Sequence, residues 1–141
     1  MNRVEVNIPS DLIFERVIRA SAAELAAQMG FAPERIEDLK LALSEAVTNA
    51  IEHGSAPAGS SSVEVSFTLD HEKLEVTIRD HGRGVEQLNF NRRVVEEENL
   101  DAGYLRGFGL YLISELVDQY EVESSPNGTV MTLRIFRTHS S

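Results

Sequence analysis

The sequence predicts an α+β fold, a two-layer sandwich in which helices pack on one face of a mixed, mostly antiparallel sheet. Segments that alternate apolar and polar residues indicate about five strands, and three longer segments have apolar residues at helical spacing. The predicted order is strand, helix, helix, strand, strand, long loop, helix, strand, strand, which favours helices gathered on one side. No internal repeat or domain boundary is visible, so residues 1–141 are expected to form a single domain.

The first third of the chain contains one predicted strand and two predicted helices. Residues 4–8 alternate and predict a strand, after which Ser10 is a suitable N-cap for a helix that stops at Gly30. The apolar residues at helical spacing in that helix are Phe14, Val17, Ile18, Leu25 and Met29. A second helix is expected to begin near Pro33, and its predicted buried stripe consists of Ile36, Leu39, Leu43, Val47 and Ala50.

Two hairpins account for the remaining predicted strands. Residues 63–69 and 74–78 alternate cleanly and predict an antiparallel pair, joined by the turn at 70–73. Near the end of the chain, residues 120–123 and 129–135 flank a Pro-Asn-Gly turn, which is a strong hairpin signal. Strands of this pattern bury one face and leave the other to solvent.

Between the two hairpins, residues 85–106 have mixed polarity and are long for a passive connection, which predicts a functional segment. A third helix is expected from Gly109 to about Tyr120. Its apolar residues at helical spacing include Leu112, Ile113, Leu116 and Val117.

The composition excludes several classes of protein. Thirteen basic and 23 acidic side chains give a net charge of −10, a surface that repels phosphate backbones and anionic lipid, so neither nucleic acid nor membrane is an expected partner. A mononucleotide remains compatible, because helix N-termini and glycine loops bind phosphate locally. There is no cysteine, which excludes disulfides and thiolate metal sites. We expect neither a signal peptide nor a membrane-spanning segment from this sequence, and a cytoplasmic location is expected.

The second predicted helix contains a pair of polar residues suited to phosphoryl transfer. Glu45 and Asn49 are four positions apart, which places them on one helix face, and we expect that face to lie opposite the buried stripe. A carboxylate can take a proton from an attacking hydroxyl, and a carboxamide oxygen can hold Mg²⁺. An ordinary solvated helix face would show the same two residue types.

Two glycine-spaced motifs follow. Asp80 comes where a predicted strand ends, and Gly82 and Gly84 behind it would let the backbone approach a flat ring while the carboxylate accepts from an exocyclic amine. Gly107 and Gly109 open the third predicted helix, where free N–H groups favour an anion. Alone, each motif is also compatible with a plain turn or helix entry. The sequence contains no P-loop motif.

The order of these motifs resembles the GHKL ATPase superfamily, which includes gyrase-type topoisomerases, heat-shock chaperones, histidine kinases and mismatch-repair proteins. Its N-box, G1 box and G2 box correspond to the Glu-x-x-x-Asn, Asp-x-Gly-x-Gly and Gly-x-Gly motifs of this chain, and the resemblance covers nearly all of it. Within that group the stretch Ser-Glu-Ala-Val-Thr-Asn-Ala-Ile-Glu-His-Gly (residues 44–54) is similar to bacterial anti-sigma factor serine/threonine kinases.

The resemblance implies a Bergerat ATP-binding fold with ATP or ADP and Mg²⁺ as ligands and with residues 85–106 as the lid over the phosphates. It implies that Glu45 is the catalytic base, that Asn49 binds the metal and that Asp80 recognises adenine. The nucleotide-binding residues that it implies, besides Asn49 and Asp80, are Gly82, Gly84, Gly107 and Gly109, with Arg106 as a candidate for the γ-phosphate or the partner.

The implied activity is phosphorylation of a STAS-domain anti-sigma antagonist, combined with sequestration of a sigma factor, in a protein that is commonly a homodimer. Two alternatives stay open: a switch kinase that acts on a STAS partner without binding sigma, and a nucleotide-gated module that sequesters sigma with little catalysis. The presence of Glu45 favours catalysis, because a clamp that neither hydrolyses nor transfers phosphate has no need of a base.

Overall fold

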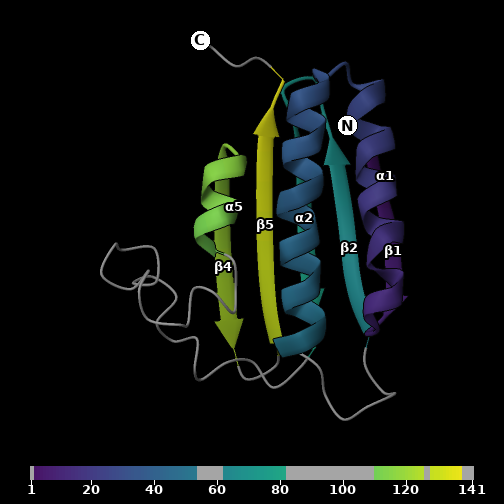
Figure 1. Cartoon of the computed structure of the whole chain (residues 1–141), viewed down its shortest axis with the longest axis vertical. Helices are drawn as coiled ribbons and strands as arrows, with labels where there is room; N and C mark the ends of the chain where they lie inside the picture. Colours follow the sequence, from purple (N-terminus) through teal and green to yellow (C-terminus); the bar gives the residue numbers. More distant parts are fainter. Residues whose placement is uncertain (1, 54–61, 82–109, 126–127, 138–141) are drawn as a thin grey trace.

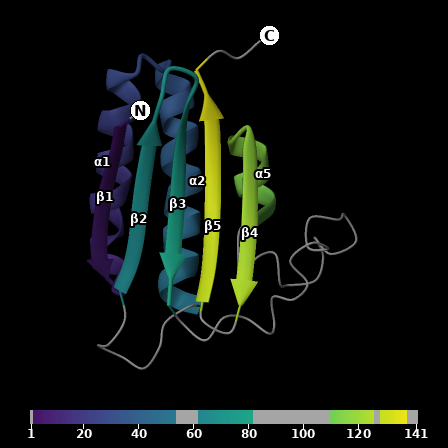
Figure 2. The same cartoon turned by 180° about the vertical axis from the view of Figure 1, so that it is seen from behind.

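The computed structural model describes residues 2–53, 62–81, 110–125 and 128–137, which form two layers. One layer is a five-stranded sheet in the order β1-β2-β3-β5-β4, and the helices of the described residues cover one of its faces (Figures 1 and 2). The strands are β1 (Asn2–Pro9), β2 (Ser62–Leu69), β3 (Lys73–Asp80), β4 (Gln119–Ser125) and β5 (Gly128–Phe136). The helices are the 3₁₀ turn η1 (Leu12–Phe14), α1 (Glu15–Gln28), α2 (Pro33–His53) and α5 (Leu110–Leu116).

The predicted α+β sandwich is confirmed, but every strand pairing in the described sheet is antiparallel, where the sequence suggested a mixed sheet. The physical reason is visible in Figures 1 and 2, where successive elements run the length of the fold in alternating directions. The two helices between β1 and β2 therefore return the chain antiparallel to its start. The same alternation through α5 and β4 brings β5 back antiparallel to β3.

The core lies between α2 and the middle of the sheet. The inward side chains of β2, β3 and β5 alternate with outward ones, as their period of two requires, and α2 covers them with a broad buried face. The largest fully buried side chains are Phe67, Ile18, Leu39, Leu43, Leu74, Ile113, Leu133, Ile135, Val47, Val63, Val65 and Val76. Since each fully buried apolar side chain of this size contributes about 1.5–3 kcal/mol, this cluster dominates the stability of the fold.

The apolar residues of the first predicted helix, which the structure divides between η1 and α1, include buried and exposed side chains. Ile18, Ala22 and Ala26, spaced four residues apart, are fully buried, whereas Phe14 and Val17 remain 36% and 46% exposed. Small alanines at the buried positions allow α1 to lie close to its neighbours. The two exposed apolar side chains are therefore accessible for contact with another molecule.

The ends of two helices differ from the prediction. The turn before α1 is capped by Asp11, whose Oδ1 accepts a hydrogen bond from the backbone of Ile13 at 3.1 Å, and not by Ser10. The chain thus inserts one 3₁₀ turn before α1 begins. In addition, α5 stops at Leu116, and Tyr120 belongs to β4, where burial raises the pKa of its hydroxyl. Tyr120 continues the helical spacing of the apolar residues in α5 and also fits the alternation of β4, so the sequence pattern does not separate the two elements.

The predicted turn between β2 and β3 is confirmed and is held by Asp70. Its Oδ1 accepts backbone hydrogen bonds from Glu72 at 2.7 Å and from Lys73 at 2.9 Å. These two donors, that of Glu72 first, hold the pKa of the Asp70 carboxyl below its ordinary value. The turn therefore loses part of this support only as the pH falls through that lowered pKa.

At the opposite end of α2 from its last turn, Asp118 joins three elements. Its Oδ2 accepts from Arg35 of α2 at 2.8 Å and from the backbone N–H of Phe136 in β5 at 2.7 Å. Arg35 also donates to the Phe136 carbonyl at 2.9 Å and lies 5.3 Å from the centre of the Phe31 ring. Because Asp118 lies between α5 and β4, this cluster ties the start of α2 and the end of α5 to the sheet.

The start of β5 requires a glycine. Gly128 has a φ of +140°, and a Cβ at this position would collide with the carbonyl oxygen of Asp80. Gly30 also has a positive φ, of +89°, but a Cβ there would meet nothing within 4 Å. A substitution at Gly30 would therefore cause backbone strain alone, whereas one at Gly128 would cause both strain and a steric collision.

We expect Asp118→Ala to destabilise the fold by about 1.5–3 kcal/mol, because it removes hydrogen bonds to a charged acceptor that joins α2 with β5. Urea unfolding followed by circular dichroism measures this change. The control is Lys40→Ala, which removes a surface ion pair with Glu37 and should cost no more than about 0.5 kcal/mol. Equal effects of the two substitutions would show that the Asp118 cluster does not join the layers.

We expect Gly128→Ala to cost more than about 2 kcal/mol, because left-handed strain and a collision with the β3 backbone add together. Gly30→Ala should cost about 1 kcal/mol, from strain alone. Thermal unfolding of both variants measures the difference. A Gly128→Ala protein as stable as Gly30→Ala would mean that the close approach of β5 to Asp80 is not required.

Candidate functional site

Three of the predicted site residues belong to the described part of the chain: Glu45, Asn49 and Asp80. The remaining ones lie outside the described residues, as does the segment 85–106 that was predicted to be the lid; they are Gly82, Gly84, Arg106, Gly107 and Gly109. The geometry of the site is therefore built from the helix and strand that bear the first three.

The helix α2 places Glu45 and Asn49 on adjacent turns, as the sequence predicts. The expectation that both project opposite the buried stripe is wrong for Asn49, which is only 7% exposed, whereas Glu45 is partly exposed. The reason is that α2 packs against α1, α5 and the sheet together, so more than one side of the helix is covered. A covered carboxamide next to an accessible carboxylate is not an ordinary solvated helix face.

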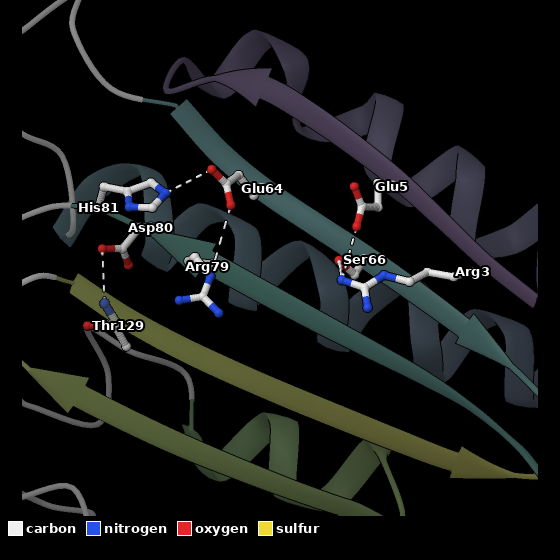
Figure 3. A network of polar contacts seen from close by, with 8 residues as sticks. All are labelled: Arg3, Glu5, Glu64, Ser66, Arg79, Asp80, His81 and Thr129. Carbon is white, nitrogen blue, oxygen red and sulfur yellow. Dashed lines mark hydrogen bonds and ion pairs between the residues drawn. The ribbon is translucent and has the colours of Figure 1, made fainter.

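The last residue of β3 is Asp80, which is 6% exposed. It is paired with Val63 of β2 on one side and with Thr129 of β5 on the other. The backbone N–H of Thr129 donates to Asp80 Oδ1 at 3.3 Å (Figure 3). This donor from the neighbouring strand restricts the orientation of the carboxylate at the point where β3 ends.

Asn49 and Asp80 are the only buried polar side chains among the described residues. Both lie at the same end of the molecule, because the last turns of α2 and the end of β3 meet there (Figures 1 and 2). Burying such groups costs free energy unless they are hydrogen-bonded, and within the described residues no buried side-chain polar atom lacks a partner. A buried amide, a buried carboxylate and a nearby accessible carboxylate therefore gather at one end of the fold.

The side chains of Asn49, Asp80 and Glu45 suit the binding of a nucleotide with Mg²⁺ and the phosphoryl transfer that the sequence suggested. A carboxylate held at a strand end can accept from an amine, and an amide oxygen is one of the oxygen ligands that Mg²⁺ takes, usually with several waters. The accessible Glu45 is placed one helical turn from Asn49 and can accept a proton from a bound hydroxyl. In the described residues no cluster of three or more His, Asp or Glu could hold a metal ion by itself.

Sequence reasoning missed two residues that contact Asp80. Thr129 supplies the backbone donor to its carboxylate, and Gly128 permits the close approach of β5 to its carbonyl. The Gly-Thr pair is visible in the sequence as the end of a hairpin turn, but only the pairing of β3 with β5 places it beside Asp80. Nothing local in the sequence indicates that pairing.

The next residue, His81, turns to the open face of the sheet, away from the helices (Figure 3). Its Nε2 lies 2.9 Å from Glu64 Oε2 of β2, and the other carboxylate oxygen of Glu64 lies 4.0 Å from Arg79 Nε. This cross-strand cluster links the end of β3 to β2.

On the helical side, an outer groove of about 980 Å³ runs between α1 and α2. Its lining includes Leu41, one helical turn before Glu45, which is 48% exposed, and basic side chains from both helices, Arg16, Arg19 and Lys40. Within the described residues, no helix combines the length and hydropathy that a membrane crossing requires.

Comparison with known proteins identifies the family of this chain. Residues 8–135 match the histidine kinase-like ATPase domain. The chain is 31% identical over 133 residues to the serine-protein kinase RsbW of Bacillus velezensis, covering 90% of this chain and 81% of that protein. It is 33% identical over 132 residues to RsbW of Bacillus cereus, covering 92% of this chain and 82% of that protein.

Solved structures agree on the fold. The structure of the RsbU and RsbW domains of Rv1364c from Mycobacterium tuberculosis matches 96% of this chain and 32% of that chain, with a TM-score of 0.70 and 23% identity. The nucleotide-free catalytic domain of the histidine kinase ThkA matches 97% of each chain, with a TM-score of 0.60 and 16% identity. The family match over residues 8–135 and the two relatives show that the chain belongs to the histidine kinase-like ATPase family, among the serine-protein kinases of the RsbW type.

Proposed function

We propose that this protein is an ATP-dependent anti-sigma factor kinase, which phosphorylates a serine or threonine of a STAS-domain antagonist and sequesters a sigma factor. The observation that supports this most directly is the gathering of Asn49, Asp80 and Glu45 at one end of the fold, in a chain of the RsbW-type kinase family. A cytoplasmic location and a homodimer complete the proposal.

In the proposed site, Asp80 accepts a hydrogen bond from the exocyclic amine of adenine, while Thr129 holds the carboxylate in place. Gly82 and Gly84 follow directly in the sequence and leave room for the ring. Gly107 and Gly109, immediately before α5, and Arg106 serve the phosphates. These glycine and arginine roles rest on the family resemblance alone.

Asn49 is the residue that would hold Mg²⁺, which neutralises phosphate charge when bound. Its burial at the end of α2 supports this role, because a fixed amide oxygen is a better ligand than a mobile one. Glu45 accepts the proton of the acceptor hydroxyl as that oxygen forms its bond to the γ-phosphorus and the bond to ADP breaks. Its partial exposure leaves it accessible to a protein substrate.

The outer groove supports a protein as the phosphate acceptor. Leu41 is a large apolar side chain, 48% exposed, on the same helix as Glu45 and one turn away. Exposed apolar side chains beside a polar site are typical of surfaces that contact another protein. An acceptor protein lying in this groove would bring its hydroxyl toward Glu45.

We expect Glu45→Gln to retain nucleotide binding and to lose phosphate transfer by about 10²–10⁴-fold, the usual contribution of a general base. Transfer of labelled phosphate from Mg-ATP to purified STAS-domain proteins measures the activity. The control is Glu52→Gln, an exposed acid on the same helix, which should change transfer by no more than about twofold. Undiminished transfer by Glu45→Gln would rule out Glu45 as the base.

If transfer is absent for every STAS protein tested while sigma binds tightly, the nucleotide-gated module replaces the kinase. If transfer occurs and sigma does not bind, the switch kinase replaces the sequestering role. These two results separate the alternatives that the sequence leaves open.

We expect Asp80→Asn to weaken ATP and ADP binding by about 10- to 100-fold, because the hydrogen bond from adenine loses its charged acceptor. Asn49→Ala should weaken binding in Mg²⁺ but leave the residual affinity in EDTA unchanged, because the amide acts on the metal. Calorimetry with and without Mg²⁺ measures both effects, and thermal unfolding without nucleotide confirms that the variants fold. Unchanged affinities would contradict the assigned site.

A further inference from the structure

The outer groove between α1 and α2 can be followed from the candidate site outward. The two helices run antiparallel side by side, and Ser44 of α2 donates a hydrogen bond to Glu15 of α1 at 2.6 Å (Figure 1). This contact places the start of α1 beside the part of α2 that bears Glu45. With increasing distance from Glu45 along the groove, the residue numbers therefore rise on α1 and fall on α2.

The half of the groove next to Ser44, here called the site half, is positively charged. Arg16 and Arg19 of α1 line it, and neither Asp nor Glu is among the described lining residues of this half. Glu15 lies 3.7 Å from Arg19, but its side chain is only 14% exposed and also accepts from Ser44. Two cations therefore face the groove, with one largely covered anion beside them.

The other half, here called the far half, is acidic. It is centred about 12 Å further along α2 than Glu45, from the rise of the helix. Its lining includes Glu24 of α1 and Glu37 and Asp38 of α2. The ammonium of Lys40 lies 3.1 Å from Glu37 and compensates one of these charges. Three carboxylates against one ammonium leave the lining of the far half negatively charged.

Between the charged ends, the groove presents apolar side chains. Leu41 of α2 and Val17 of α1 both line it and are 48% and 46% exposed. Two small residues of α1, Ala20 and Ala23, also line it and leave room between the helices. A groove between two helices, with apolar side chains exposed in it, fits a helix or an extended segment of another protein.

The acids of the far half do not converge on a metal ion. Within the described parts of the chain, no group of three or more His, Asp or Glu could hold one. These carboxylates are therefore separate charges along the wall of the groove, which suits a segment with several basic side chains. The net charge of −10 attracts such a segment from a distance and speeds its encounter with the protein.

We propose that the far half of the outer groove binds a basic segment of the phosphate-accepting protein, and that the positive site half sets the direction in which that protein lies. The inference rests on the proposed function, because it concerns the acceptor of the same kinase. A basic segment is attracted by the far half and repelled by the site half, so one direction of docking is favoured over its reverse. That direction keeps the acceptor hydroxyl near Glu45.

Transfer kinetics with the full chain, Mg-ATP and a purified STAS-domain acceptor test the far half. We expect Glu37→Lys/Asp38→Lys to raise the KM for the acceptor about tenfold or more, while kcat and the KM for ATP stay within about twofold of wild type, because only docking is changed. At about 0.5 M salt the difference in KM should fall to about threefold or less, since exposed charges are then screened.

The matched control is Glu115→Lys, which reverses an exposed acid of the helical layer that lies on α5, outside the groove. It should leave all three kinetic constants unchanged, and thermal unfolding should show that every variant folds. An unchanged KM for the acceptor in the double variant, an equal change in Glu115→Lys, or a loss confined to kcat would each overturn the inference.

Photocrosslinking identifies what lies in the groove, because the chain has no native cysteine. A maleimide-linked benzophenone is attached to Val17→Cys, nearer the site, or to Ala27→Cys, an exposed position beyond Glu24. Irradiation with the acceptor and mass spectrometry should find a basic acceptor segment at position 27, and a segment nearer the phosphorylated hydroxyl at position 17. An acidic acceptor segment at position 27, or a sigma factor or second copy of this chain there in place of the acceptor, would overturn the inference.

Transfer by the wild type separates this inference from the proposed function. If the wild type phosphorylates an acceptor and the double variant has the same KM for it, the inference alone fails and the kinase stands. If the wild type transfers phosphate to none of the STAS proteins, the proposed function fails and the inference fails with it.

Discussion

The packing of α2 across the middle of the sheet forms the core and sets how exposed the polar residues of the candidate site are. The helix contacts α1 on one flank and α5 on the other, and its buried stripe meets the inward side chains of β2, β3 and β5. Because the helix is covered on several sides, its polar residues cannot all reach solvent. Asn49 is buried as a consequence, while Glu45, one turn earlier, stays partly accessible. The same contact thus creates the core and leaves Asn49 buried and Glu45 accessible, as their proposed roles of metal ligand and base require.

A second constraint acts at the end of the sheet, where β5 begins beside the last residue of β3. Gly128 lets the two backbones approach, and the N–H of Thr129 then reaches the Asp80 carboxylate. Asp80 is held by a strand pair, which suits a residue that must present its oxygens to a ligand in one orientation. On the other face of the sheet, His81 contacts Glu64 and links the end of β3 to β2.

The candidate site and the outer groove lie on different parts of the fold. Asn49 and Asp80 lie where the last turns of α2 meet the end of β3 (Figure 1). The groove that includes Leu41 runs between α1 and α2, and Val17, which is 46% exposed, also lines it. In the proposed function the first region binds the nucleotide and the second contacts the protein acceptor.

The number and order of the main elements could be predicted from the sequence, and so could the candidate site residues Glu45, Asn49 and Asp80, because helical spacing, strand alternation and the order of the motifs are local patterns. The sequence also identified the family through those motifs. It did not determine that every strand pair is antiparallel, that Asn49 is buried, or that Phe14 and Val17 remain exposed. Nor did it place Gly128 and Thr129 beside Asp80. Each of these depends on which elements lie side by side, and contacts between residues about 50 positions apart, such as Thr129 and Asp80, leave no periodic trace in the chain. These features could not be predicted, because burial and strand pairing depend on which residues are neighbours in space.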